Sequence, residues 1–129
     1  MANIVKRVLR FDAAQRRLFE MIYEAAAIFR PGPGRSEKRT RLETVLAKLE
    51  PGTLERDREQ GQNPDLTLRT IRGPLQLELP ESERDLLIEA MDAIDWPGFA
   101  SAKAGAARQL LLDAERVEEP APAAAAKPQ

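Results

Sequence analysis

Proline and glycine stand next to each other in four segments of this chain of 129 residues, and they limit how long any helix or strand can be. The segments are 31–34, 51–52, 73–74 and 97–98. Proline lacks the backbone N–H that a helix interior or a central strand needs, and glycine loosens the chain. Each segment therefore predicts the end of the element before it, and the chain is expected to form several short elements.

The first two stretches between these breaks carry helical patterns. Apolar residues recur at spacings of four, three and four from Leu18 to Phe29, and Asp12 can cap the chain with Gln15 as its capping-box partner. This predicts an amphipathic helix over residues 13–29. A second helix is expected to begin with Ser36 as its cap and to end at Pro51-Gly52. Its apolar face consists of Leu42, Val45, Leu46 and Leu49.

Two further helices are expected in the second half of the chain. Ser82, with Asp85 at the capping-box position, predicts the start of a third helix. The core face of that helix is Leu86, Leu87, Ala90, Met91 and Ile94. The fourth helix is expected over about residues 99–115. Its inward face is predicted to be Phe99, Ala102, Ala106, Leu110 and Leu111.

Three segments are candidates for strands. Leu75, Leu77 and Leu79 alternate with polar residues, which is the pattern of a half-buried strand. Residues 66–70 alternate in the same way and could pair with 75–79 in a hairpin. Residues 5–11 fit a short strand, with Arg7 among the apolar residues of one face, although a helical stripe fits them as well. The polar stretch 53–65 is interpreted as a loop.

These elements predict a small α+β domain that is rich in helix, with about four helices and two or three short strands. The domain is expected to cover residues 1–116. Residues 117–129 are rich in proline and alanine and predict a disordered tail, because they have too little apolar surface to offset the entropy of ordering. The two halves also align at a shift of about 68 residues, which places Arg16 on Arg84. Either a strand–helix–helix repeat or a chance match of core positions explains this.

The residue types exclude several kinds of chemistry. The chain has no cysteine and no histidine, so disulfides, the usual zinc sites, cysteine nucleophiles and histidine-based triads are excluded. We expect no enzymatic activity, no cofactor and no metal. Asp85, Glu89 and Asp92 share one helix face and could hold Mg²⁺ or Ca²⁺, but such a row is more often a solvated polar face.

The location of the protein is expected to be cytoplasmic. No apolar run is long enough to span a membrane, and the N-terminus lacks the features of a secretory signal. The composition, which is rich in alanine and arginine, is typical of a GC-rich bacterial or phage genome. No membrane partner is expected.

Charge is unevenly distributed along the chain. Residues 1–41 carry ten basic and four acidic side chains, a net charge of +6, whereas residues 42–95 carry six and thirteen, a net charge of −7. One hypothesis is an exposed basic surface that contacts nucleic acid or another anion. The other is pairing between the two halves within the fold. The basic candidates are Arg30, Arg35, Lys38, Arg39 and Arg41.

The function that we expect is a small accessory or interaction protein that binds another protein. Trp96 and Phe99 are its candidate partner contacts, because a pair of exposed aromatic residues could anchor a partner. A core-plugging role is the alternative for Trp96. Nucleic-acid binding through residues 30–41 is the alternative function, and the sequence leaves the oligomeric state open.

Overall fold

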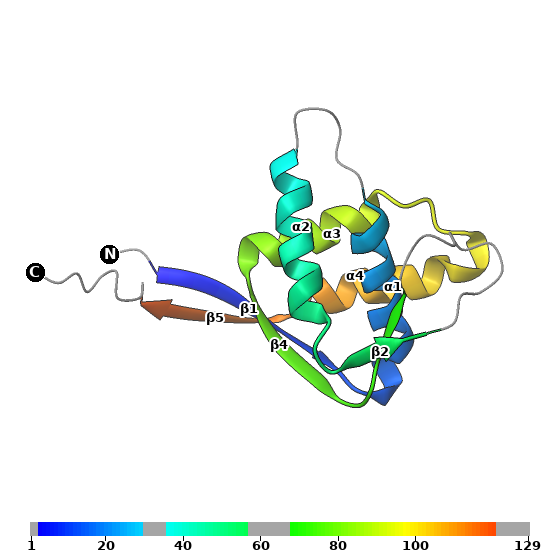
Figure 1. Ribbon diagram of the computed structural model, residues 1–129, viewed down its shortest axis with the longest axis horizontal. Coiled ribbons are helices and arrows are strands. Elements are labelled where there is room, and N and C mark those ends of the chain that lie inside the picture. Colours follow the sequence, from blue (N-terminus) through cyan, green and yellow to red (C-terminus); the bar gives the residue numbers. More distant parts are fainter. Residues whose placement is uncertain (1–2, 30–35, 57–67, 121–129) are drawn as a thin grey trace, which may run out of the picture.

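The structure, a computed structural model, describes residues 3–29, 36–56 and 68–120. Four helices confirm the predicted α+β class, but the strands in these ranges number five rather than two or three. The elements, shown in Figure 1, are β1 (Asn3–Phe11), η1 (Ala13–Gln15), α1 (Arg16–Ile28), α2 (Ser36–Leu49), β2 (Thr53–Glu55), β3 (Arg69–Ile71), β4 (Leu75–Pro80), α3 (Glu81–Asp92), η2 (Gly98–Ala100), α4 (Ser101–Leu112) and β5 (Glu115–Pro120).

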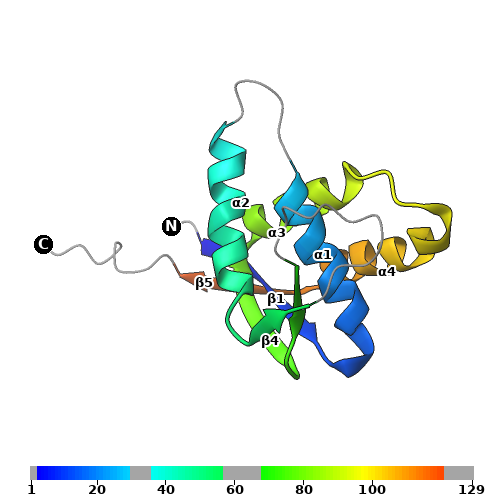
Figure 2. The ribbon, with the colours of Figure 1, turned by 45° about the vertical axis from the view of Figure 1, so that its right-hand side comes forward.

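Strand β1 is the centre of the larger sheet, whose order is β4-β1-β5. Both neighbours are antiparallel to β1, and residues 6–11 of β1 pair with β4 whereas residues 3–8 pair with β5. The β1–β5 pair therefore extends beyond β4 as a two-stranded ribbon. It projects from the body of helices in both ribbon views (Figures 1 and 2).

Helix α1 forms where the sequence predicts it and lies at the centre of the helical body, in contact with α2, α3 and α4. The expected capping box forms at the start of η1, the short turn that leads into α1: Asp12 Oδ1 accepts a hydrogen bond from the Ala14 N–H at 2.9 Å, and Gln15 Oε1 accepts one from the Asp12 N–H at 2.9 Å. The two rings Phe11 and Phe19 meet edge to face at 5.2 Å. This contact joins the end of β1 to α1 in the core.

The predicted hairpin of residues 66–70 and 75–79 is wrong. Strand β3 pairs with β2, while β4 pairs with β1. The segment Thr53–Glu55, which we interpreted as loop, is strand β2. It pairs with β3, where the predicted hairpin placed β4. Gly52 makes this possible, because its φ of +81° turns the chain back directly after α2. Residues 57–67, the rest of the predicted loop, lie outside the described residues.

The predicted cap of the third helix is also wrong. Helix α3 begins at Glu81 with Pro80 as its N-cap, and Ser82 is already inside the first turn without a capping hydrogen bond. Pro80 is the last residue of β4, so strand and helix are joined without a loop. Glu81 and Glu83 then place two negative charges in the first turn, where the helix dipole favours them.

The predicted inward face of α4 is wrong in most of its members. The residues buried on this helix are Ala104, Ala107 and Leu111, and Ala100 precedes them in η2. Ala102 and Ala106 are exposed, Leu110 is half-buried, and Phe99 is 89% exposed. The helix ends at Leu112 rather than near residue 115.

The predicted boundary of the tail is wrong by several residues. Val117 to Pro120 belong to β5, where they pair with Lys6 to Asn3 of β1. Residues 121–129 lie outside the described residues. The backbone of this polar segment finds its hydrogen bonds on β1, which a local count of apolar residues does not detect.

The order of the elements agrees with the proposed repeat. Each half contains a strand, two helices and a strand, namely β1-α1-α2-β2 and β4-α3-α4-β5, and β3 between them has no counterpart among the described residues. Leu9 and Leu77, which a shift of 68 residues aligns, are also Cα partners in the β1–β4 pair. The smaller strands depart from the repeat, since β5 pairs with β1 whereas β2 pairs with β3.

Candidate functional site

The basic candidates on α2 have partners within the fold. Lys38 Nζ lies 2.8 Å from Glu89 Oε2 on α3, so it forms an ion pair between the two helices. Arg39 donates hydrogen bonds to the carbonyl oxygens of Ala26 at 3.1 Å and Phe29 at 3.2 Å, where the end of α1 needs donors. Arg41 is exposed, and Arg30 and Arg35 lie outside the described residues.

The carboxylate row on α3 is balanced by cations of the same chain. Asp85 Oδ1 lies 2.8 Å from Arg84 Nε, and Asp92 Oδ1 lies 2.7 Å from Arg108 Nε. Glu89 is the partner of Lys38. Within the described ranges no group of acidic residues is arranged to hold a metal ion. Glu89 and Asp92 thus join α3 to α2 and α4, whereas the pair of Asp85 lies within α3.

A second set of charged groups lies between α1 and the small sheet. Glu20 accepts a hydrogen bond from the Thr70 hydroxyl at 2.7 Å and lies 3.6 Å from Arg56 Nε, and both charged side chains are at most 14% exposed. Burial raises the pKa of the neighbouring Tyr23 hydroxyl above its usual value, and Glu50 raises it further. The contacts of Glu20 with Thr70 and Arg56 join α1 to strand β3 of the small sheet and to the residue that follows β2.

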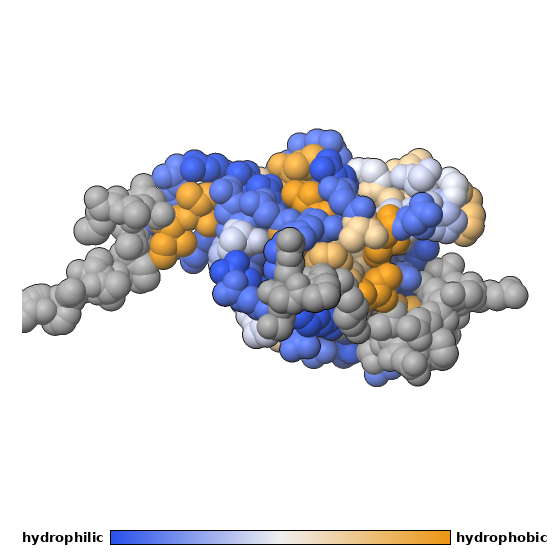
Figure 3. All heavy atoms as spheres, turned by 90° about the horizontal axis from the view of Figure 1, so that it is seen from above, coloured by the Kyte–Doolittle hydropathy of each residue, from blue (hydrophilic) through white to orange (hydrophobic). Residues whose placement is uncertain are grey.

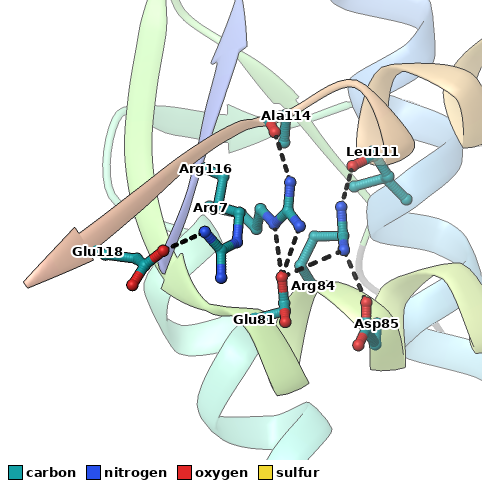
Figure 4. Close-up of polar contacts among 8 residues, drawn as sticks. All are labelled: Arg7, Glu81, Arg84, Asp85, Leu111, Ala114, Arg116 and Glu118. Carbon is teal, nitrogen blue, oxygen red and sulfur yellow. Dashed lines mark hydrogen bonds and ion pairs between the residues drawn. The ribbon is translucent and has the colours of Figure 1, made fainter. Parts of the chain in front are cut away.

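A cluster of arginines fixes the end of α4 and the start of β5 (Figure 4). Arg7 on β1 donates to Glu81 Oε1 at 2.6 Å and 2.9 Å and to the Ala114 carbonyl at 3.1 Å. Arg84, 7% exposed, donates to the Leu111 carbonyl at 2.9 Å. The hydrogen bond from Arg7 lowers the pKa of the Glu81 carboxyl below its usual value.

The sequence carries a local signal for part of this cluster. Arg7 stands on the apolar face of β1, where a cation needs a buried partner. Arg84 aligns with Arg16 in the proposed repeat, and both donate to a backbone carbonyl of a later element: Arg16 reaches Ile71 on β3 at 3.4 Å, and Arg84 reaches Leu111 on α4 at 2.9 Å. Local sequence did not indicate which carbonyls these were.

Trp96 and Phe99, three residues apart, lie in opposite environments. The Trp96 indole N–H donates to the Met91 carbonyl at 3.2 Å, and its ring packs against the core. This is the core-plugging alternative of the sequence analysis. Phe99 is 89% exposed in the middle of η2. The Ala100 N–H donates a hydrogen bond to the Pro97 carbonyl at 2.8 Å. This bond and the packing of Trp96 hold the connection between α3 and α4 in place, so Phe99 is presented from an ordered turn.

The exposed side of α4 continues from Phe99 along a helical stripe. Phe99, Ala102, Ala106 and Leu110 follow at spacings of three, four and four, and we call these four residues the Phe99 face. The neighbouring side of α4 packs on the core through Ala104, Ala107 and Leu111, and the half-buried Leu110 of the Phe99 face also contacts the core. A helix with apolar residues on more than one side is usually buried on all of them. In α4 the side that carries the Phe99 face is instead open to solvent. The end of the molecule with η2 and the start of α4 is largely pale to orange in Figure 3.

A groove of about 470 Å³ lies beside the C-terminal half of the Phe99 face. Its apolar lining includes Val8, Leu18 and Leu110, and its polar lining includes Arg10 and Asp113. Ala106 and Leu110 belong to both the face and the groove. The Phe99 face thus has a protruding aromatic ring at one end and a partly apolar depression at the other.

Comparison of the chain with protein-family models, with curated proteins and with solved structures finds no match. No helix in the described part of the chain has the length and apolar character that crossing a membrane requires. The candidate site therefore rests on the geometry of the Phe99 face.

Proposed function

We propose that this chain is a small, non-enzymatic accessory protein of a bacterial or phage system that acts in the cytoplasm by binding another protein through the Phe99 face. The observation that carries the proposal is the 89% exposure of Phe99 on an ordered turn. Large apolar side chains that protrude from a rigid scaffold are typical anchors of protein interfaces.

The energetics favour an anchor at this position. Transferring a phenylalanine side chain from water to a partner's apolar pocket contributes about 1.5–3 kcal/mol. Phe99 is already held by the η2 turn, so binding orders little further backbone. Ala102 and Ala106 have short side chains, which leaves room for a partner to approach the helix closely.

The charged groups support a protein partner over a nucleic acid. Lys38 and Arg39 are engaged by Glu89, by Glu43 and by backbone carbonyls, so they are not free to neutralise phosphates. A nucleic-acid function predicts binding of duplex DNA that weakens steeply with salt and is lost on changing Lys38, Arg39 and Arg41 to alanine. We expect no binding to lose, and micromolar binding abolished by that change would reject our proposal.

A photo-crosslinking amino acid in place of Phe99 tests the interaction in cells that make the protein. We expect crosslinked products of defined mass from position 99. Leu54, an exposed apolar residue of β2 with 41% exposure, is the matched control position and should give none of these products. The second change Ala106→Arg should remove them, because it places a charge in the centre of the face. Identical products from positions 99 and 54 would reject the Phe99 face as a binding surface.

A further inference from the structure

We infer that a second copy of this chain occupies the Phe99 face, with the two α4 helices packed antiparallel about a two-fold axis at Ala106. This inference rests on the proposed function and names the partner. It follows from the way in which the face is complementary to itself in shape and in charge.

The two ends of the Phe99 face are complementary in shape. In an antiparallel pair centred on Ala106, residue 102 of one helix lies opposite residue 110 of the other, and residue 99 opposite residue 113. The groove lined by Leu110 and Asp113 then receives Phe99 of the other copy. The two-fold axis repeats this contact, so two protruding rings enter two grooves. A volume of about 470 Å³ is ample for one phenyl ring.

Small residues at the centre allow the helices to come close. Ala102 and Ala106 are exposed, and Gly105 on the adjacent side has open space around it, with no atom within 4 Å of where a Cβ would lie. Helices that pack through such residues can approach to about 8 Å between their axes, the short end of the usual range. Phe99 of one copy can reach the groove of the other only if the two helix axes approach closely. The small residues at the centre of the face and the ring and groove at its ends therefore favour the same packing of the two helices.

Two charged side chains near the ends of α4, Lys103 and Asp113, have no ion pair among the described residues. Lys103 is exposed near the start of the helix, and Asp113 is exposed just after its end, where it accepts a hydrogen bond from the Gln109 amide at 2.9 Å. Ten residues of helix separate them by about 15 Å, which is too far for an ion pair within one chain. Antiparallel packing brings Lys103 of one copy opposite Gln109 of the other, one turn from Asp113. Lys103 of each copy can then form an ion pair with Asp113 of the other, and the two-fold axis repeats this Lys103–Asp113 pair.

Sedimentation of the full chain over a range of concentrations tests the dimer. We expect the mass to rise from 14.4 kDa toward twice that value with increasing concentration. Phe99→Ala should raise the dissociation constant at least about tenfold, since each dimer loses two anchors. Lys103→Asp and Asp113→Lys should each weaken the dimer, and combining them in one chain should restore it. Leu54→Ala, which shortens an exposed leucine on β2, is the control and should leave the mass curve unchanged.

Single cysteines test the geometry, because the chain has none of its own. Ala106→Cys should form an intermolecular disulfide across the axis under mild oxidation. Ala102→Cys alone should not, because two copies of residue 102 lie about 12 Å apart along the helix axes. A mixture of Ala102→Cys chains and Leu110→Cys chains should crosslink one to the other.

The possible outcomes separate this inference from the proposed function. A chain that stays at 14.4 kDa at every concentration overturns the dimer, and so does crosslinking of residue 102 to residue 102. If position 99 nevertheless crosslinks to a different protein in cells, the proposed function stands and only the identity of the partner is wrong. The charge exchange keeps the test decisive even if a cysteine variant folds poorly.

Discussion

Three successive leucines at the end of α4 differ in their surroundings, and their replacement by alanine measures which side of the helix faces the core. Leu111 is 0% exposed, Leu110 is half-buried beside the groove, and Leu112 is 40% exposed. The three changes remove the same atoms from one turn of one helix. Helix propensity therefore cancels in the comparison, and the differences report the packing.

The magnitudes follow from burial. Leu111→Ala removes a fully buried side chain and leaves a cavity, which costs about 2–5 kcal/mol. Leu110→Ala loses only part of the burial of a leucine and opens onto the groove, so we expect about 1 kcal/mol. Leu112→Ala is expected to lie within about 0.5 kcal/mol of the wild type, as for other exposed positions.

Urea unfolding followed by circular dichroism provides the measurement. The midpoint should fall most for Leu111→Ala at an unchanged slope m, because the surface exposed on unfolding is nearly the same. The protein must be dilute enough to be monomeric. Otherwise the loss of a dimer contact in Leu110→Ala would add to the measured change in the free energy of unfolding. If Leu110→Ala is as costly as Leu111→Ala or more so, α4 faces the core as the sequence pattern predicts, and the Phe99 face is not a surface.

Three further predictions concern the arginine cluster and the C-terminus. Because Arg7 lowers the pKa of Glu81, this carboxylate contributes stability that is present above about pH 4.3 and is lost as the pH falls through the lowered pKa. In Glu81→Gln the melting temperature should therefore fall less steeply as the pH is lowered. An unchanged dependence of the melting temperature on acid pH would contradict this prediction. Arg84→Met should cost about 1–3 kcal/mol in urea unfolding, because the Leu111 carbonyl loses its charged donor and keeps the longer bond from the Ala114 N–H. Truncation after Val117 should lower the melting temperature because three pairs of β1 with β5 are lost, whereas truncation after Pro120 keeps these pairs and should not; equal melting temperatures would contradict the pairing.

Some elements of this protein could be predicted because their determinants are local. The segment that forms η1 and α1 has a capping box, a regular apolar stripe and a break that follow one another in the sequence, and it is helical as predicted. Strand β4 alternates strictly and also forms as predicted. In both elements the residues that define the structure are neighbours along the chain, so a pattern of a few residues carries the information.

The pairing of the strands depends on partners that are distant in sequence. Strand β5 is polar because the ribbon that it forms with β1 has solvent around it, so its composition resembles that of a tail. Hydrogen bonds to β1, more than one hundred residues earlier, keep it ordered. The same dependence on distant partners explains why the predicted hairpin is replaced by the β2–β3 and β4–β1 pairs. Backbone hydrogen bonds do not depend on which side chains the strands carry, so the side-chain pattern of a strand does not identify its partner.

The candidate site was the least predictable part of the molecule. Helix α4 carries two apolar stripes, one through Phe99 and Leu110 and one through Leu111, and its many alanines fit a buried or an exposed position equally well. The sequence by itself determined that this segment is a helix with apolar sides. Only the packing of α4 against α1 and α3 decided that Leu111 faces the core and Phe99 faces the solvent, because the volume between three helices selects the stripe that fills it.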